Sequence, residues 1–83
     1  MNNHIRAHIQ LTTLADINNF VNELNKDNFT NCYALENFDG SLRVNARSIH
    51  GIIYAASDYN DEMFLVNESD DGVFPSGIDK YRV

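Results

Sequence analysis

The sequence has few of the cysteines with which many small domains form disulfide bonds or structural metal sites, and it is also poor in proline and tryptophan. It has 83 residues with one cysteine, one proline and no tryptophan. Because Cys32 is the single cysteine, the chain cannot form an intrachain disulfide. The absence of disulfides is typical of proteins in a reducing cytoplasm. Residues 1–4 are polar and form no apolar signal core, and no apolar run is long enough to span a bilayer. We therefore expect a cytoplasmic chain that depends on its apolar core for stability.

Basic residues are also scarce. Six Lys and Arg stand against twelve Asp and Glu, which gives a net charge of −6. Nucleic-acid-binding domains usually carry a basic stripe, whereas these six residues are scattered, so we expect no direct contact with nucleic acid. The same balance disfavours an anionic membrane surface and favours encounters with positively charged partners.

Apolar periodicity predicts a strand and then a helix in the first third of the chain. Residues 4–11 alternate apolar and polar side chains, the period of a strand with one wet face. Thr13 and Asp16 have the spacing of a capping box, and a helical apolar stripe follows them, so we expect a helix that ends near Lys26 or Asp27. That stripe consists of Leu14, Ile17, Phe20, Val21 and Leu24.

The remaining elements are shorter. Residues 32–37 and 42–46 are rich in strand formers and flank a turn that contains a glycine. Ser48 can cap a second helix, which a polar turn at residues 58–61 separates from a fourth strand at residues 63–66. Residues 73–83 contain Pro75 and Gly77, so we expect at best one or two helical turns around residues 78–81.

These elements follow one another in the order β-α-β-β-α-β. A chain of this order and length forms one α+β domain, an open-faced sandwich of a four-stranded antiparallel sheet with the helices on one face. A short or truncated helix would end the chain. We expect the apolar helical stripe to meet Ile5, Ile9, Val44 and Leu65 in the core.

One segment resembles a known family in sequence. Residues 44–52 read VNARSIHGI and are similar to the regulatory segment of HPr, the histidine phosphocarrier of the bacterial sugar phosphotransferase system. There a strand ends in Asn or Asp, a small or apolar residue and a basic residue, and a serine caps the second helix. The resemblance extends in pattern over residues 14–24 and 79–83. It implies an HPr-like domain over residues 1–83, with Ser48 in place of the serine that HPr kinase phosphorylates.

The phosphorylated histidine of HPr has no counterpart here. HPr carries it just before the first helix, followed by Ala, Arg and Pro, where this chain has Thr13 as the nearest match and then Ala15 and Asp16. A threonine phosphate is a stable ester and does not pass its phosphoryl group onward, and Asp16 would repel an incoming phosphate. We therefore expect no phosphocarrier activity. A small enzyme is a third possibility that no residue pattern supports, so we expect a non-catalytic protein.

The resemblance implies a partner surface made of Thr13, Arg47, Ile49, His50 and Ile52. The corresponding surface of HPr docks enzyme I, the kinase and a transcriptional regulator, so a kinase, a transcriptional regulator or a phosphotransferase component is the implied partner. His50 would make this surface sensitive to pH near neutrality. The alternative is that Ser48 is a plain helix cap, the two isoleucines belong to the core and His50 is merely solvated.

Other kinds of site are not indicated. His4 and His8 would lie about 13 Å apart on a strand and could not share a metal ion. The acidic loop at residues 68–71 lacks the EF-hand spacing, and Cys32 is expected to be an unreactive, half-buried strand residue. No cofactor is expected, and no nucleophile–base pair that would mark a small enzyme is recognisable.

The sequence thus predicts a non-catalytic, HPr-like regulatory or interaction module that phosphorylation at Ser48 can switch. The second hypothesis is a structural or oligomerisation α+β domain without a phosphotransfer role. In that case exposed edge strands would favour dimers, and for either hypothesis we expect a monomer or a weak homodimer.

Overall fold

The computed structural model describes residues 5–28 and 30–83 and shows an α+β fold. The elements follow one another as β1 (Arg6–Ile9), α1 (Leu14–Asn25), β2 (Tyr33–Glu36), β3 (Arg43–Asn45), α2 (Ile49–Tyr59), the 3-10 helix η1 (Asn60–Glu62), β4 (Met63–Asn67) and the 3-10 helix η2 (Ser76–Tyr81). The predicted β-α-β-β-α-β order is confirmed, and the short terminal helix is a 3-10 helix.

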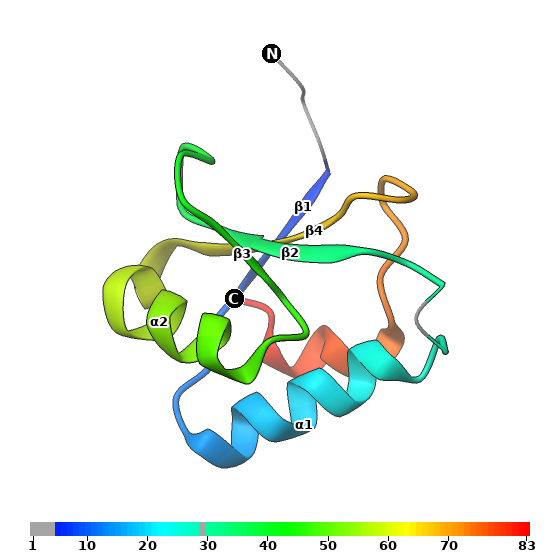
Figure 1. Ribbon diagram of the computed structural model, residues 1–83, viewed down its shortest axis with the longest axis horizontal. Helices are drawn as coiled ribbons and strands as arrows, with labels where there is room; N and C mark the ends of the chain where they lie inside the picture. Colours follow the sequence, from blue (N-terminus) through cyan, green and yellow to red (C-terminus); the bar gives the residue numbers. More distant parts are fainter. Residues whose placement is uncertain (1–4, 29) are drawn as a thin grey trace.

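The four strands form one sheet in the order β1-β4-β2-β3, and every neighbouring pair is antiparallel. β4 and β2 are the central strands, with Leu35 opposite Leu65. Both helices and η2 lie on the same side of the sheet (Figure 1). The predicted open-faced arrangement is therefore present.

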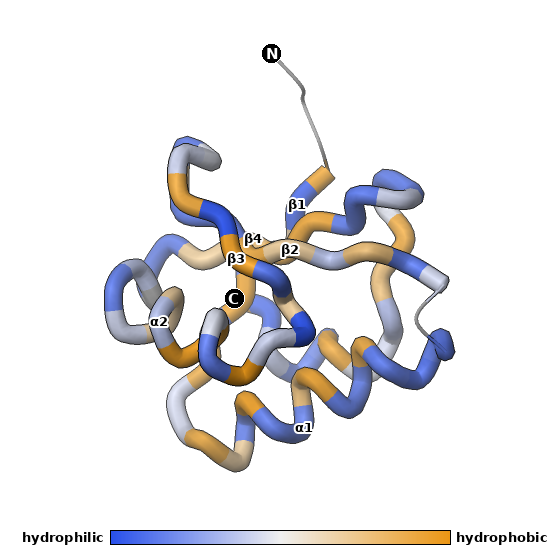
Figure 2. Tube along the Cα trace, viewed as in Figure 1, coloured by the Kyte–Doolittle hydropathy of each residue, from blue (hydrophilic) through white to orange (hydrophobic). Residues whose placement is uncertain are grey.

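The core lies between the sheet and this helical layer. α1 buries Ile17, Phe20, Val21 and Leu24, the spacing expected of a helix with one apolar face. Apolar segments of the sheet and of α1 face each other across the layer in Figure 2. Each fully buried large apolar side chain contributes about 1.5–3 kcal/mol. The sheet and the chain ends supply Ala7, Ile9, Leu11, Tyr33, Leu35, Met63, Leu65, Ile78 and Tyr81.

Two residues that the sequence placed in the core are exposed. Leu14 is the first residue of α1 and follows directly on the cap residue Thr13, and it lies outside the buried face of the helix. Ile5 precedes the first paired residue of β1, Arg6, and therefore lies outside the sheet ladder. The prediction was wrong for both because periodicity alone does not show where an element leaves the core.

α2 is longer than the sequence predicted. Residues 58 and 59, expected in a polar turn, are its last two residues, and η1 continues the turn directly to β4. The extension follows from Tyr59, which is half-buried and packs against the core cluster. As a result, Asp58 lies in the last turn of a helix.

Candidate functional site

Ser48 occupies the cap position of α2. Its Oγ accepts a hydrogen bond from the backbone N of Gly51 at 3.1 Å, and its carbonyl accepts one from the N of Ile52 at 2.9 Å. Its own N donates to the carbonyl of Asn45 at 3.1 Å, which ties the helix start to the end of β3. Ser48 is half-buried, so it is both a cap and a residue at the surface. Such a cap stabilises a helix by about 1 kcal/mol.

Gly51 allows the first turn of α2 to lie close to β3. A Cβ at this position would come within 3.3 Å of the Cβ of Val44 and 3.4 Å of the Asn45 carbonyl oxygen. A larger residue would therefore push the helix start away from the strand. The glycine of the SIHGI sequence thus fixes where Ser48 sits relative to the sheet.

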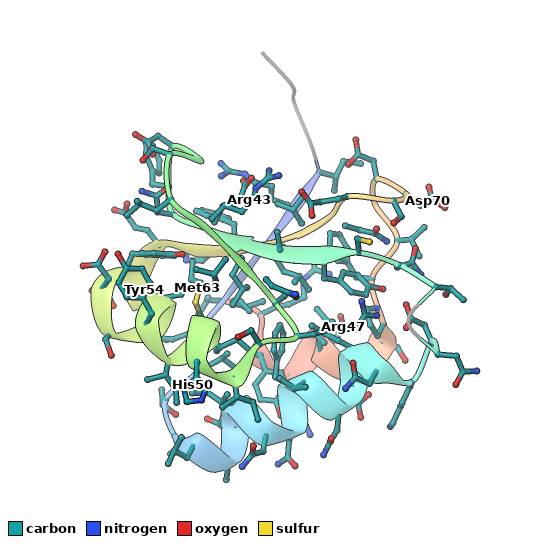
Figure 3. All side chains as sticks on the ribbon, viewed as in Figure 1. Arg43, Arg47, His50, Tyr54, Met63 and Asp70 are labelled. Carbon is teal, nitrogen blue, oxygen red and sulfur yellow. The ribbon has the colours of Figure 1, made fainter. Side chains whose placement is uncertain are left out.

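Four exposed side chains follow Ser48 on α2: Ile49, His50, Ile53 and Tyr54. We call them the α2 face. Ile49, Ile53 and Tyr54 are 40%, 38% and 54% exposed, and His50 and Tyr54 project from successive turns (Figure 3). Because residues four apart lie one turn apart, Ile49 and Ile53 are neighbours on one flank of the helix. Ile53 and Tyr54 were missed from the sequence, although the four-residue spacing to Ile49 could have indicated Ile53.

The prediction that Ile52 belongs to this surface is wrong. Ile52 is fully buried and faces the core together with Ala55. The structure thus divides the segment by burial, and a partner contact on its exposed residues stays a prediction. Ile49 and His50 are exposed as the partner surface requires, whereas Ile52 is a core residue.

Arg47 is likewise turned away from the α2 face. Its side chain is only 13% exposed and pairs with Asp27 at 2.8 Å. The guanidinium donates to the carbonyl of Leu24 at 3.0 Å, to Oδ1 of Asn25 at 2.9 Å and to the carbonyl of Asn31. Arg47 therefore clamps the end of α1 to the start of α2, a role that the sequence did not indicate. Figure 3 shows it lying between these two elements.

Thr13 caps α1, as the sequence predicted. Its Oγ1 accepts a hydrogen bond from the N of Asp16 at 3.0 Å. The Asp16 carboxylate turns to the neighbouring residue instead, and accepts from Oγ1 of Thr12 at 2.9 Å. These hydrogen bonds, that of the Thr12 side chain first, hold the pKa of Asp16 below its usual value. Thr13 is exposed, and a carboxylate lies one helical turn from it.

The helix-free face of the sheet carries a separate ionic network. Arg43 donates from Nε to Oε2 of the buried Glu36 at 3.0 Å and pairs with Glu68 as well. Arg6 lies 3.5 Å from the other oxygen of Glu36 and 4.2 Å from the ring centre of Phe64. The bond to Glu36 raises the pKa of Arg43. Both arginines are therefore engaged on the side of the sheet opposite the helices.

The remaining candidate sites from the sequence concern metal ions and Cys32. Residues 5–28 and 30–83 contain no group of three His, Cys, Asp or Glu side chains that could hold a metal ion. His4 lies outside these residues, so its predicted separation from His8 stays a prediction. Cys32 precedes β2 and is exposed rather than half-buried. No helix in the described part of the chain is long and apolar enough to cross a membrane.

A hollow of about 610 Å³ lies beside Cys32 and not at the α2 face. Arg43 and Arg47 line it, together with Glu68. Both arginines already hold carboxylates of this chain, so the hollow offers no uncommitted cation to a ligand.

Comparison of the chain with protein-family models, with curated proteins and with solved structures found no match in any of the three.

Proposed function

We propose that this chain is a non-catalytic regulatory or protein-interaction module of the HPr-like kind, acting in the bacterial cytoplasm. It would contact a protein partner through the α2 face and be switched by phosphorylation of Ser48. The observation that carries the proposal is the position of Ser48, half-buried at the cap of α2 and followed by exposed Ile49 and His50, within the segment that resembles HPr.

The start of α2 is a favourable place for a phosphate group on Ser48. The first turn of a helix presents unpaired N–H groups and partial positive charge, which favour an anion by about 0.3–1 kcal/mol. The group would add a charge of about −1.5 to −2 beside the α2 face. Because Arg47 is committed to Asp27 and Arg43 to Glu36 and Glu68, the backbone amides of α2 would be its main ligands.

The α2 face supports a contact role better than isolated apolar residues would. Single exposed apolar side chains are ordinary on soluble proteins. Here two isoleucines one turn apart adjoin an exposed tyrosine and a histidine, a combination of apolar and aromatic groups that is typical of the centres of protein interfaces. A kinase, a transcriptional regulator or a phosphotransferase component is the kind of partner that the HPr resemblance implies. The scattered basic residues support no direct contact with nucleic acid or membrane.

The region around Thr13 supports the absence of phosphocarrier activity. The Thr13 hydroxyl accepts from Asp16, and the carboxylate of Asp16 would oppose a phosphoryl group on Thr13. No imidazole occupies this position, so no labile N–P bond can form at the start of α1.

The second hypothesis, a structural or oligomerisation domain, depends on open sheet edges. Part of the outer edge of β1 is paired, because Gln10 donates to the Tyr81 carbonyl and Val83 donates to the His8 carbonyl, both at 2.9 Å. The opposite edge strand, β3, has three residues. Short or paired edges discourage strand exchange, which favours the interaction module. An obligate dimer that buries Ser48, found by sedimentation over a concentration series, would reverse this preference.

A phosphorylation assay tests the proposal directly. The purified chain is incubated with an HPr kinase and ATP, and separately with enzyme I and phosphoenolpyruvate, and its intact mass is measured. We expect one phosphate from the kinase, lost in Ser48→Ala and kept in Ser57→Ala, an exposed serine further along α2. Labelling by enzyme I would contradict the conclusion drawn for Thr13. Kinase labelling that survives Ser48→Ala would remove Ser48 as the switch.

A further inference from the structure

The acidic residues at the end of α2 stand out because no Lys or Arg in the described part of the chain forms an ion pair with them. We call Asp58, Asp61 and Glu62 the acidic end. All three are exposed. Within residues 5–28 and 30–83 no Lys or Arg forms an ion pair with any of them, whereas several other acidic residues do have such a partner. The acids with such a partner include Glu23, Asp27, Glu36, Glu68 and Asp79.

The six basic residues of the chain are all engaged elsewhere. Five of them, Arg6, Lys26, Arg43, Arg47 and Arg82, form ion pairs with the acids just named, and Lys80 lies 5.3 Å from the ring centre of Tyr81. No Lys or Arg occurs between positions 47 and 80 of the sequence. Among residues 5–28 and 30–83, no Lys or Arg therefore balances the negative charge of Asp58, Asp61 and Glu62, and the ring of His8 contacts the backbone carbonyl of Asp61 at 3.0 Å.

The direction of α2 adds to this imbalance. A helix has a partial negative charge at its C-terminus, where cations are favoured and anions disfavoured. The last turn of α2 has no basic residue and carries Asp58, and η1 follows with Asp61 and Glu62. Three carboxylates and the helix end thus present negative charge at one place. Burial, and then the neighbouring Tyr54 and Asp58, raise the pKa of Tyr59 in the same region.

The surface beside these carboxylates is hollowed. A depression of about 480 Å³ is lined by Ala56, Ser57 and Tyr59 together with the whole acidic end. It lies one to two turns beyond Ile53 and Tyr54 along the same helix. A long cationic side chain could enter it while an apolar residue beside it covered the α2 face.

We propose that the partner docked on the α2 face is a basic amphipathic segment of another protein, whose apolar side covers Ile49, Ile53 and Tyr54 and whose Lys or Arg side chains pair with Asp58, Asp61 and Glu62. The proposal rests on the proposed function and adds the chemistry of the partner. Charge complementarity selects a basic partner, since an acidic one would meet uncompensated charge of its own sign.

The test uses two peptide probes and the full chain labelled with ¹⁵N. One probe is an 18-residue amphipathic helix of Leu and Lys, and the other is the same peptide with Glu in place of every Lys. We expect the Lys peptide to shift backbone amide signals of α2 and η1 in NMR spectra, with an affinity that falls about tenfold between 50 and 300 mM NaCl. The Glu peptide should shift none of them.

Two variants with matched charge make the test specific. The triple substitution D58N/D61N/E62Q removes the acidic end, and D70N/D71N/D79N removes the same number of charges elsewhere. We expect the first variant to bind the Lys peptide with about tenfold lower affinity than the unaltered chain. The affinity of the second variant should differ from that of the unaltered chain by less than about threefold. The amide spectrum of each variant without peptide shows whether the variant is folded. The salt dependence is measured on the unaltered chain, so this part of the test does not depend on the folding of any variant.

The outcomes separate the two proposals. Equal binding of both peptides at the α2 face would keep the docking surface and overturn the requirement for a basic partner. Equal weakening by both triple variants, or Lys-peptide shifts confined to other elements, would also overturn it, because net charge alone would then explain binding. If neither peptide shifts α2, the docking surface of the proposed function fails together with the inference.

Discussion

Removing the Arg47 side chain should destabilise the fold more than removing any other basic side chain. Arg47 joins the end of α1, the residues before β2 and the start of α2 through hydrogen bonds to Leu24, Asn25, Asn31 and Asp27. Its side chain is 13% exposed and that of Asp27 19%, so water compensates little for the lost bonds.

The expected magnitude follows from these contacts. Hydrogen bonds to charged groups contribute about 1.5–3 kcal/mol each at most, and losing one partner of a largely buried ion pair costs about 3–5 kcal/mol. Because both groups retain some solvent contact, we expect Arg47→Ala to lower the free energy of unfolding by about 2–4 kcal/mol. A domain of this size loses about 4–8 °C of melting temperature per kcal/mol.

Urea unfolding followed by circular dichroism measures this free energy. Arg82→Ala is the matched control, since the Arg82–Asp79 pair is exposed at 3.6 Å and should change stability by less than about 1 kcal/mol. A double-mutant cycle with Asp27→Ala isolates the Arg47–Asp27 coupling. A loss below about 1 kcal/mol for Arg47→Ala would refute the clamp, and a coupling energy near zero would refute its ionic part.

Three further perturbations probe the caps, the core and the response to acid. Ser48→Ala should lower the free energy of unfolding by about 0.5–2 kcal/mol, measured by urea unfolding, and an unchanged value would mean that the Gly51 bond does not stabilise α2. Phe20→Ala should cost about 3–5 kcal/mol in the same assay, because Phe20 is fully buried. The lowered pKa of Asp16 implies stability that is present above about pH 4 and is lost as pH falls through the folded-state value. Thr12→Val should raise that pKa towards its usual value in an NMR titration, and an unchanged pKa would show that the Thr12 bond does not set it.

The sequence predicted the fold because its local signals agree with its long-range pairing. The apolar stripe of α1, the alternation in β1 and the turn before β3 each indicate one element, and the order of the elements then restricts the sheet to few arrangements. Local signals were less reliable at the ends of helices and strands, where the burial of individual side chains determines how far the element extends. α2 passes through residues 58 and 59 because Tyr59 packs on the core, although Asp58 and Asn60 read as a turn.

The candidate site was predicted only in part, and Arg47 shows why. Its hydrogen-bond partners lie 16–23 residues earlier in the chain, so no local pattern connects them with position 47. One signal was available: the last turn of α1 has no basic residue, and a helix end of this kind favours a cation from elsewhere. Ile52 was misplaced for a simpler reason, because an apolar residue in an amphipathic helix can lie on the buried face or beside it.

The distribution of charge determines how phosphorylation of Ser48 would act. When phosphorylation orders a segment, an arginine usually forms an ion pair with the new phosphate group. Here Arg43 and Arg47 are paired with carboxylates of this chain. A phosphate on Ser48 would therefore add negative charge at one end of the α2 face, and the acidic end already carries negative charge at the other end. A basic segment lying along α2 would then be attracted at both ends. We therefore expect the Ser48 phosphoprotein to bind the Lys peptide more tightly than the unmodified chain at 50 mM NaCl, with the difference shrinking at 300 mM. Weaker binding of the phosphoprotein would show that the phosphate hinders the contact and that the partner approaches from another side.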